Sequence, residues 1–174
     1  IDLTQCWDGP ENRRIADTRL SVAICYGNPP DSMAGTPART SYVGMAGIGV
    51  DAAELPRIPP ISPRAGCWSY DEPTPFTAIR DGLSQTILHA ETGRDRGPWM
   101  QGGPATVRAV PDVPDADASG LLGSGRPFAG NHPLGGNFAM ADGSVRWLDD
   151  GIDPDVFANL VTIAGADCEP IPGE

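Results

Sequence analysis

The stretch that decides the fold reads Asn137-Phe138-Ala139-Met140-Ala141-Asp142-Gly143-Ser144-Val145-Arg146-Trp147-Leu148. It contains two alternating runs, and the dipeptide Asp142-Gly143 separates them. This pattern predicts a β-hairpin with a two-residue type I′ turn, because that turn needs positive φ at both central positions and Asp and Gly tolerate it. We therefore expect antiparallel strands at residues 137–141 and 144–148.

Working outward, the sequence predicts three further strands and two short helices around this hairpin. The strands are expected near residues 20–25, 41–48 and 84–91. In the segment 41–48 small residues alternate with larger ones, and its glycines suit a strand that another backbone approaches closely. The helices are expected within residues 13–18 and at 154–163.

Long segments without periodicity connect these strands, at residues 51–75 and 92–130. Because regular helices do not alternate with the strands, a parallel βαβ arrangement is disfavoured. The expected fold class is α+β, with an antiparallel β-sheet, long irregular loops and a short C-terminal helix. A chain of 174 residues has the size of one ordinary domain, so residues 1–174 are expected to form a single unit.

The composition excludes several classes of protein. Glycine (22 residues) and proline (19 residues) together approach a quarter of the chain, which excludes a helical bundle. The formal net charge is −11, and all 12 basic residues are arginines, so charge-driven binding to nucleic acid or to an anionic membrane surface is disfavoured. Uninterrupted apolar runs reach about four residues, far short of the ~20 that cross a bilayer.

Four cysteines, Cys6, Cys25, Cys67 and Cys168, are spread along the chain without a Cys-x-x-Cys pair. Since the chain has only two histidines, this spacing argues against a structural zinc site and favours two disulfides formed in an oxidising compartment. Of the three possible pairings, Cys6–Cys25 with Cys67–Cys168 is favoured, because the first two bracket one short helix. The alternative is buried, reduced thiols in a cytosolic protein.

The sequence lacks the motifs of the common hydrolases and transferases, including Gly-x-Ser-x-Gly, the phosphate loop and His-Glu-x-x-His. A triad of a serine, His132 and Asp142 is conceivable, since His is the usual general base. However, His132 lies in the Gly/Pro-rich segment before the hairpin, where we expect it to bond a loop carbonyl or the Asp142 region. His89 is expected to be a partly buried strand residue. We therefore assign no catalytic residue.

Four carboxylates lie within seven residues between the hairpin and the last helix: Asp149, Asp150, Asp153 and Asp155. Oxygen ligands in a flexible loop are what Ca²⁺ prefers, so these residues are a candidate calcium site. Their spacing does not fit an EF-hand loop. The favoured alternative is that Asp153 caps the helix and the other carboxylates are solvated near its positive end.

The segment 131–148 resembles a family signature. His132, nine intervening residues and then Asp142-Gly143 are similar to the His-x9-Asp-Gly motif of the DUF1559 proteins. These are pilin-like proteins, similar to type II secretion pseudopilins, and abundant in Planctomycetes. The segment 81–88 with Glu91 resembles the family's Asp-Gly-x-Ser-Asn-Thr-Ile-x-x-x-Glu strand.

The resemblance covers nearly the whole chain, with one departure. Residues 41–44 are similar to the family's Asn-Tyr-x-Gly element, and the last helix resembles its C-terminal helix. Where the family usually has Cys-Pro-Ser-Asp-Pro, this chain has Cys25-Tyr26-Gly27-Asn28-Pro29. The family begins with a prepilin leader and a hydrophobic stem helix, so we expect this chain to be a pilin-like globular head without its stem.

The resemblance implies a non-enzymatic structural or interaction subunit of a pseudopilus-like or secretion-associated assembly. The implied location is the cell envelope, periplasmic or at the cell surface, with a membrane anchor in the full-length form. Other pilin-like subunits or envelope proteins are the expected partners, and no cofactor is expected apart from the candidate calcium. The alternative is an envelope hydrolase or ligand-binding module that uses His132, Asp142 and Glu91 around a cleft.

Overall fold

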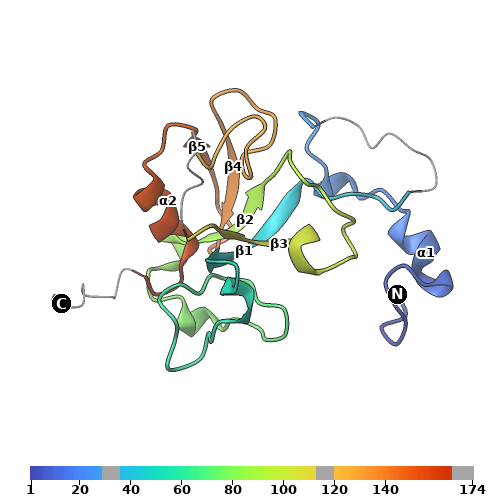
Figure 1. Ribbon diagram of the computed structural model, residues 1–174, viewed down its shortest axis with the longest axis horizontal. Coiled ribbons are helices and arrows are strands. Elements are labelled where there is room, and N and C mark those ends of the chain that lie inside the picture. The colour runs from blue at the N-terminus through green and yellow to red at the C-terminus, as the bar shows by residue number, and fades with distance from the viewer. Residues whose placement is uncertain (29–35, 113–119, 166–174) are drawn as a thin grey trace.

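The computed structural model describes residues 1–28, 36–112 and 120–165, and a β-sheet lies at its centre (Figure 1). The strands are β1 (Tyr42–Ile48), β2 (Ile87–Glu91), β3 (Val107–Val110), β4 (Gly135–Met140) and β5 (Val145–Asp149). The helices are α1 (Pro10–Ala16) and α2 (Pro154–Val161). The strand order is β3-β1-β2-β4-β5. The predicted α+β class with a short C-terminal helix is therefore confirmed.

The sheet is mixed, whereas the sequence predicted an antiparallel one. Strands β1 and β2, β2 and β4, and β4 and β5 pair antiparallel, but β1 and β3 pair parallel. Strand β3 lies within the segment 92–130, which was predicted to be irregular. Its sequence, Val-Arg-Ala-Val, does not alternate strictly between apolar and polar residues, so periodicity could not reveal it.

The predicted strand at 20–25 is wrong. Residues Ser21–Ala23 form a single turn of 3-10 helix, and the Val22 side chain is 83% exposed. The segment contacts the sheet region through a bond from the Ser41 N–H to the Ala23 carbonyl (2.8 Å). A β-branched residue there had suggested a strand, but the segment makes no strand pairing in the described structure.

The predicted hairpin is confirmed, with a different turn. Gly143 has a φ of +85°, while Asp142 does not have positive φ. The Gly143 N–H donates to the Met140 carbonyl (3.0 Å), and the Met140 N–H donates to the Ser144 carbonyl (2.8 Å). These bonds define a three-residue loop, in which a type I turn precedes a left-handed glycine. One positive φ is therefore needed, and the glycine supplies it.

The glycines of β1 admit another backbone, as the sequence predicted. The segment 64–68 runs antiparallel beside the end of β1, and a Cβ on Gly47 would collide with the Arg64 carbonyl. The Gly66 N–H donates to the Ala46 carbonyl (2.6 Å), and the Trp68 N–H donates to the Met45 carbonyl (2.9 Å). This pairing fixes the middle of the long segment 51–75 against the sheet.

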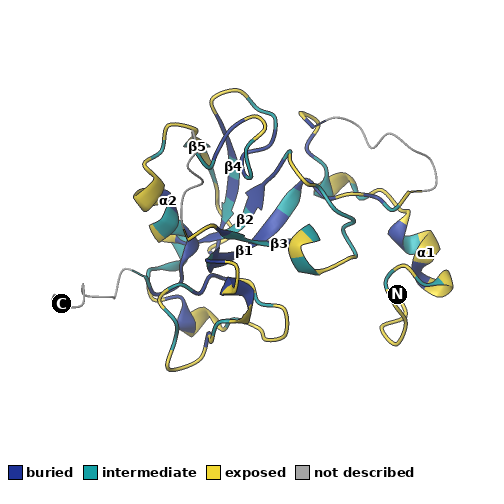
Figure 2. Ribbon diagram, in the orientation of Figure 1, coloured by how far each residue is buried: buried dark blue, intermediate teal, exposed yellow. Residues whose placement is uncertain are grey.

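Helix α2 covers one face of the sheet and forms the main core with it (Figure 2). Its buried residues Phe157 and Val161 pack against side chains such as Val43 and Phe138. Because side chains alternate along a strand, the neighbouring residues Tyr42 and Asn137 lie on the opposite face. In the described part of the chain, no helix has the length and apolar character needed to span a membrane.

Candidate functional site

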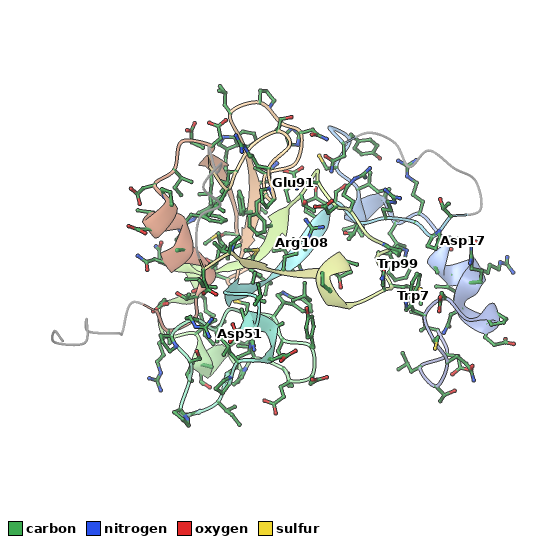
Figure 3. The ribbon with its side chains drawn as sticks, viewed as in Figure 1. Trp7, Asp17, Asp51, Glu91, Trp99 and Arg108 are labelled. Atoms are coloured by element: carbon green, nitrogen blue, oxygen red, sulfur yellow. The ribbon has the colours of Figure 1, made fainter. Side chains whose placement is uncertain are left out.

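Glu91, the last residue of β2, is a fully buried acid on the face of the sheet opposite α2 (Figure 3). One of its carboxylate oxygens, Oε2, accepts bonds from the Asn137 backbone N–H (3.0 Å) and from the Asn137 side-chain amide (3.4 Å). A Cβ on Gly130, whose φ is +63°, would lie 3.1–3.2 Å from this carboxyl group. These neighbours fix the carboxyl group and leave its other oxygen, Oε1, directed elsewhere.

His132 approaches that second oxygen from the segment before β4. Its Nε2 atom lies 3.0 Å from Glu91 Oε1, and its side chain is 31% exposed. The imidazole meets the Trp147 ring of β5 edge-on, with centroids 5.9 Å apart. His132 was predicted to bond a loop carbonyl or the Asp142 region. Instead it bonds Glu91, a residue that the resemblance singled out for a different motif.

Cys25 completes the cluster. Its Sγ lies 3.1 Å from His132 Nε2, and the Gly27 N–H donates to this sulfur (3.3 Å). The Cys25 side chain is buried, and burial raises the pKa of its thiol, with a further increase from the bond with Glu91. A Cβ on Gly27 would lie 3.1 Å from the His132 ring, so a glycine lets the imidazole pass close to the backbone.

Sequence reasoning missed Cys25 as a member of this site. It was assigned to a disulfide, and 107 residues separate it from His132. No local spacing could indicate such a contact. The available signal was the family element that begins with a cysteine, since its cysteine is retained here while the residues after it differ.

The cluster is not arranged like a nucleophilic triad. In a triad, the nucleophile and the orienting acid bond to different nitrogens of the imidazole. Here Cys25 Sγ and Glu91 Oε1 both approach the same atom, His132 Nε2. The ligand atoms of all three residues lie within 4.8 Å of one another. Sulfur, nitrogen and carboxylate oxygen around one point are the ligand types that transition metals bind.

Asp142 stands apart from this cluster, so the predicted grouping of His132, Asp142 and Glu91 is not formed. Asp142 Oδ1 accepts bonds from the Ser144 hydroxyl (2.6 Å) and the Ser144 N–H (2.9 Å). These two bonds lower the pKa of Asp142. Asp142 and Gly143 therefore shape the hairpin turn, while His132 and Glu91 meet at the sheet face.

The aspartates near α2 do not gather into a metal site. Across residues 1–28, 36–112 and 120–165, the group of three metal-ligating side chains is the Cys25 cluster, and it includes none of Asp149, Asp150, Asp153 and Asp155. Asp153 caps α2, accepting bonds from the backbone N–H groups of Asp155 (2.9 Å) and Val156 (3.2 Å). Asp149 accepts a bond from the Gly151 N–H (2.9 Å). The capping role that the sequence favoured for Asp153 is therefore observed.

The predicted disulfides do not form among the described cysteines. Cys6, Cys25 and Cys67 are free thiols, so the favoured Cys6–Cys25 pairing is wrong and Cys67 is likewise unpaired. The fourth cysteine, Cys168, lies outside the described residues. The physical reason is that the Cys25 sulfur is directed into the cluster with Glu91 and His132, while Cys6 is exposed.

His89 is a partly buried strand residue, as predicted. Its ring meets the Trp68 ring edge-on, with centroids 5.1 Å apart. Burial lowers the pKa of His89, which keeps the imidazole neutral at pH 7. His89 is therefore an uncharged part of the open sheet face.

Comparison with known proteins gives one match. The model of a family described as "Protein of unknown function (DUF1559)" matches residues 2–155. No curated protein and no solved structure matches the chain.

Proposed function

The chain belongs to the DUF1559 family, and on that premise we propose that it is a non-enzymatic interaction subunit of a pseudopilus-like or secretion-associated assembly of the cell envelope. The family's function is unknown, so membership by itself supplies no reaction. The proposal rests on one observation: part of the sheet face opposite α2 is apolar and is not covered by any other described element.

A groove of about 780 Å³ runs across this face. Its lining comes from all five strands and from neighbouring loops: Val22, Ala23, Thr40, Tyr42, Trp68, His89, Trp99, Thr106, Val107, Asn137, Ala139 and Val145. None of these residues carries a formal charge at neutral pH. Val145 and the adjacent Trp147 of β5 are 66% and 49% exposed. Contiguous exposed apolar surface of this kind marks interaction sites.

The groove fits an apolar, uncharged segment of a different subunit. A net charge of −11 makes two copies of this chain repel each other, which disfavours a second copy as the occupant. The proposed occupant is therefore another pilin-like subunit, and the envelope location belongs to the same proposal. The envelope hydrolase is not proposed, because Asp142 bonds Ser144 in the hairpin turn and is not directed toward Glu91 and His132.

A site-specific crosslinking experiment tests this function. A photoreactive residue is placed at Val145, in the groove, or at Val156, an exposed valine of α2 on the other side of the sheet. In cells that express the full-length protein, Val145 should crosslink to another pilin-like subunit in the envelope fraction, and Val156 should not. The substitution Val145→Asp should abolish the crosslinked assembly while the purified protein keeps its circular dichroism spectrum. Equal crosslinking from both positions, or a full-length protein found outside the envelope, would refute the proposal.

A further inference from the structure

We infer that Cys25, Glu91 and His132 form a binding site for a divalent transition-metal ion of the zinc class. This site lies beside the groove proposed above, on the same face of the sheet, and does not depend on an occupant of the groove. The sequence argued against zinc because it lacks paired cysteines and has only two histidines. The fold nevertheless brings three metal-ligating side chains together from three distant segments.

The shared imidazole nitrogen is the first argument. A nitrogen carries either one hydrogen or one lone pair, and His132 Nε2 faces both Cys25 Sγ (3.1 Å) and Glu91 Oε1 (3.0 Å). One hydrogen cannot make two good bonds in these two directions. A metal ion between the three atoms would instead accept a lone pair from each of them.

The balance of charge is the second argument. The carboxyl group of Glu91 is fully buried, and the ion pair it forms in the described structure is with His132. A buried carboxylate is costly unless a positive charge or hydrogen bonds compensate it. A divalent ion with a thiolate, a carboxylate and a neutral imidazole gives a site of zero net charge. On binding, the thiol proton of Cys25 leaves for the solvent.

The distances from His132 Nε2 to the other two ligand atoms are close to those of a zinc site, and Cys25 Sγ lies within 4.8 Å of the Glu91 oxygen. Around a tetrahedral zinc ion, bond lengths of about 2.0–2.3 Å place neighbouring ligand atoms about 3.3–3.6 Å apart. The observed separations of 3.0 and 3.1 Å need to grow by only a few tenths of an ångström. Nitrogen and sulfur ligands favour zinc-class ions over Ca²⁺ or Mg²⁺, which prefer oxygen ligands alone.

Surrounding groups already hold the ligands in place. The backbone N–H and the side-chain amide of Asn137 donate to Oε2 of Glu91, and the Gly27 N–H donates to the Cys25 sulfur. Such contacts orient metal ligands and are part of most metal sites. The His132 side chain is 31% exposed, so solvent reaches one member of the cluster and a fourth ligand could come from it. Three protein ligands and one open position are typical of zinc sites that bind a water or a small ligand.

The test is metal binding by the purified 174-residue chain. Protein stripped with a chelator is titrated with Zn²⁺ against a chromophoric competitor, and the bound metal is counted by mass spectrometry. We expect one Zn²⁺ per chain. The substitutions Cys25→Ser, Glu91→Gln and His132→Gln should each weaken binding by at least about 10–100-fold, the loss known for supporting residues alone.

A control variant separates this site from the other thiols. The triple substitution Cys6→Ser, Cys67→Ser and Cys168→Ser leaves Cys25 as the single cysteine and should keep the affinity. Substituted with Co²⁺, this variant should show a sulfur-to-cobalt charge-transfer band, and Cys25→Ser should lose it. The folded wild-type chain tests the inference without any variant, so an unfolded substitution does not weaken the experiment. Failure of the wild type to bind one equivalent, a cobalt spectrum without the band, or binding unchanged in Cys25→Ser would overturn the inference.

Discussion

Arg57 shows how one side chain can organise an irregular segment. It is almost completely buried, and its guanidinium donates to the carbonyls of Gly66 (2.9 Å), Leu55 (2.6 Å) and Ala52 (2.9 Å), with further bonds to Ala46 and Trp68. Burial lowers the pKa of this guanidinium, although arginine stays charged in proteins. The planar group thus satisfies several backbone carbonyls of the largely irregular segment 51–75 and holds the segment against β1.

Replacing Arg57 with lysine should therefore destabilise the protein although the charge is kept. Lysine has three donors and no planar fork, so several buried carbonyls would lose their partner. We expect Arg57→Lys to lower the free energy of unfolding by about 2–4 kcal/mol, measured by urea denaturation. The same change at the exposed Arg14 of α1 should stay within about 0.5 kcal/mol. A near-neutral Arg57→Lys would contradict this role.

His132→Ala should also destabilise the metal-free protein. The substitution leaves Glu91 Oε1 buried without its partner and removes the ring that packs against Trp147. We expect a loss of ~1–3 kcal/mol in the free energy of unfolding, measured by chemical denaturation with a chelator present. In the Glu91→Gln background the cost should be smaller, because an amide is easier to leave unpaired than a carboxylate. An equal cost in both backgrounds would show that His132 does not act through Glu91.

At the scale of the element, the β4–β5 hairpin carries a pH-dependent contact. The Ser144 hydroxyl and backbone N–H both bond the Asp142 carboxylate, and they lower its pKa. A carboxyl group whose pKa is lowered in the folded state stabilises that state above its unfolded pKa. The contribution disappears as the pH falls through the folded value. The turn should therefore loosen at acid pH.

Carboxyl titration followed by NMR checks this prediction. Asp142 should titrate below its ordinary pKa, and Ser144→Ala should raise its pKa because the hydroxyl bond is lost. Asp51 is a suitable internal control, since Arg64 lowers the pKa of Asp51 in another part of the protein. Its pKa should be unchanged in Ser144→Ala. If the Asp142 pKa did not move, the hydroxyl bond would not be the cause of its shift.

At the scale of the whole molecule, the two faces of the sheet have different roles. Helix α2 seals one face into the core, while the other carries the apolar groove and, beside it, the buried Glu91. Tyr42 lies on this second face, and burial, followed by the nearby Glu91 and Cys25, raises its pKa. A single mixed sheet thus separates the core, on the α2 side, from the face that carries the proposed docking groove and the proposed metal site.

The fold also predicts which thiols react in the native protein. Cys6 is exposed, whereas Cys25 and Cys67 are buried, and burial raises the pKa of Cys67 to about 12. In the Cys168→Ser variant, treated with a chelator at pH 8, iodoacetamide should modify Cys6 quickly and reach the other two only after denaturation. Peptide mapping by mass spectrometry reports the labelled residues. A Cys6–Cys25 disulfide in the unreduced protein, or fast labelling of Cys67, would contradict the structure.

The sequence by itself determined the elements whose signals are local. Asp142-Gly143 between two alternating runs indicated the hairpin, Asp153-Pro154 indicated the start of α2, and the glycines of 41–48 indicated the close approach of another backbone to β1. Each of these features is caused by residues next to one another in the chain, so a local sequence pattern is enough to predict it.

Tertiary structure alone decided the rest. Strand β3 forms because its four residues pair with the edge of β1, whereas Ser21–Ala23 finds no strand partner and forms one turn of 3-10 helix. Cys25 is 107 residues from His132 in the sequence, and Glu91 is 41 residues from it. Their contacts with His132 depend on how the loops are placed around the sheet. Spacing motifs detect ligands that one local element positions. A site assembled from three separate segments becomes visible only when the whole chain has folded.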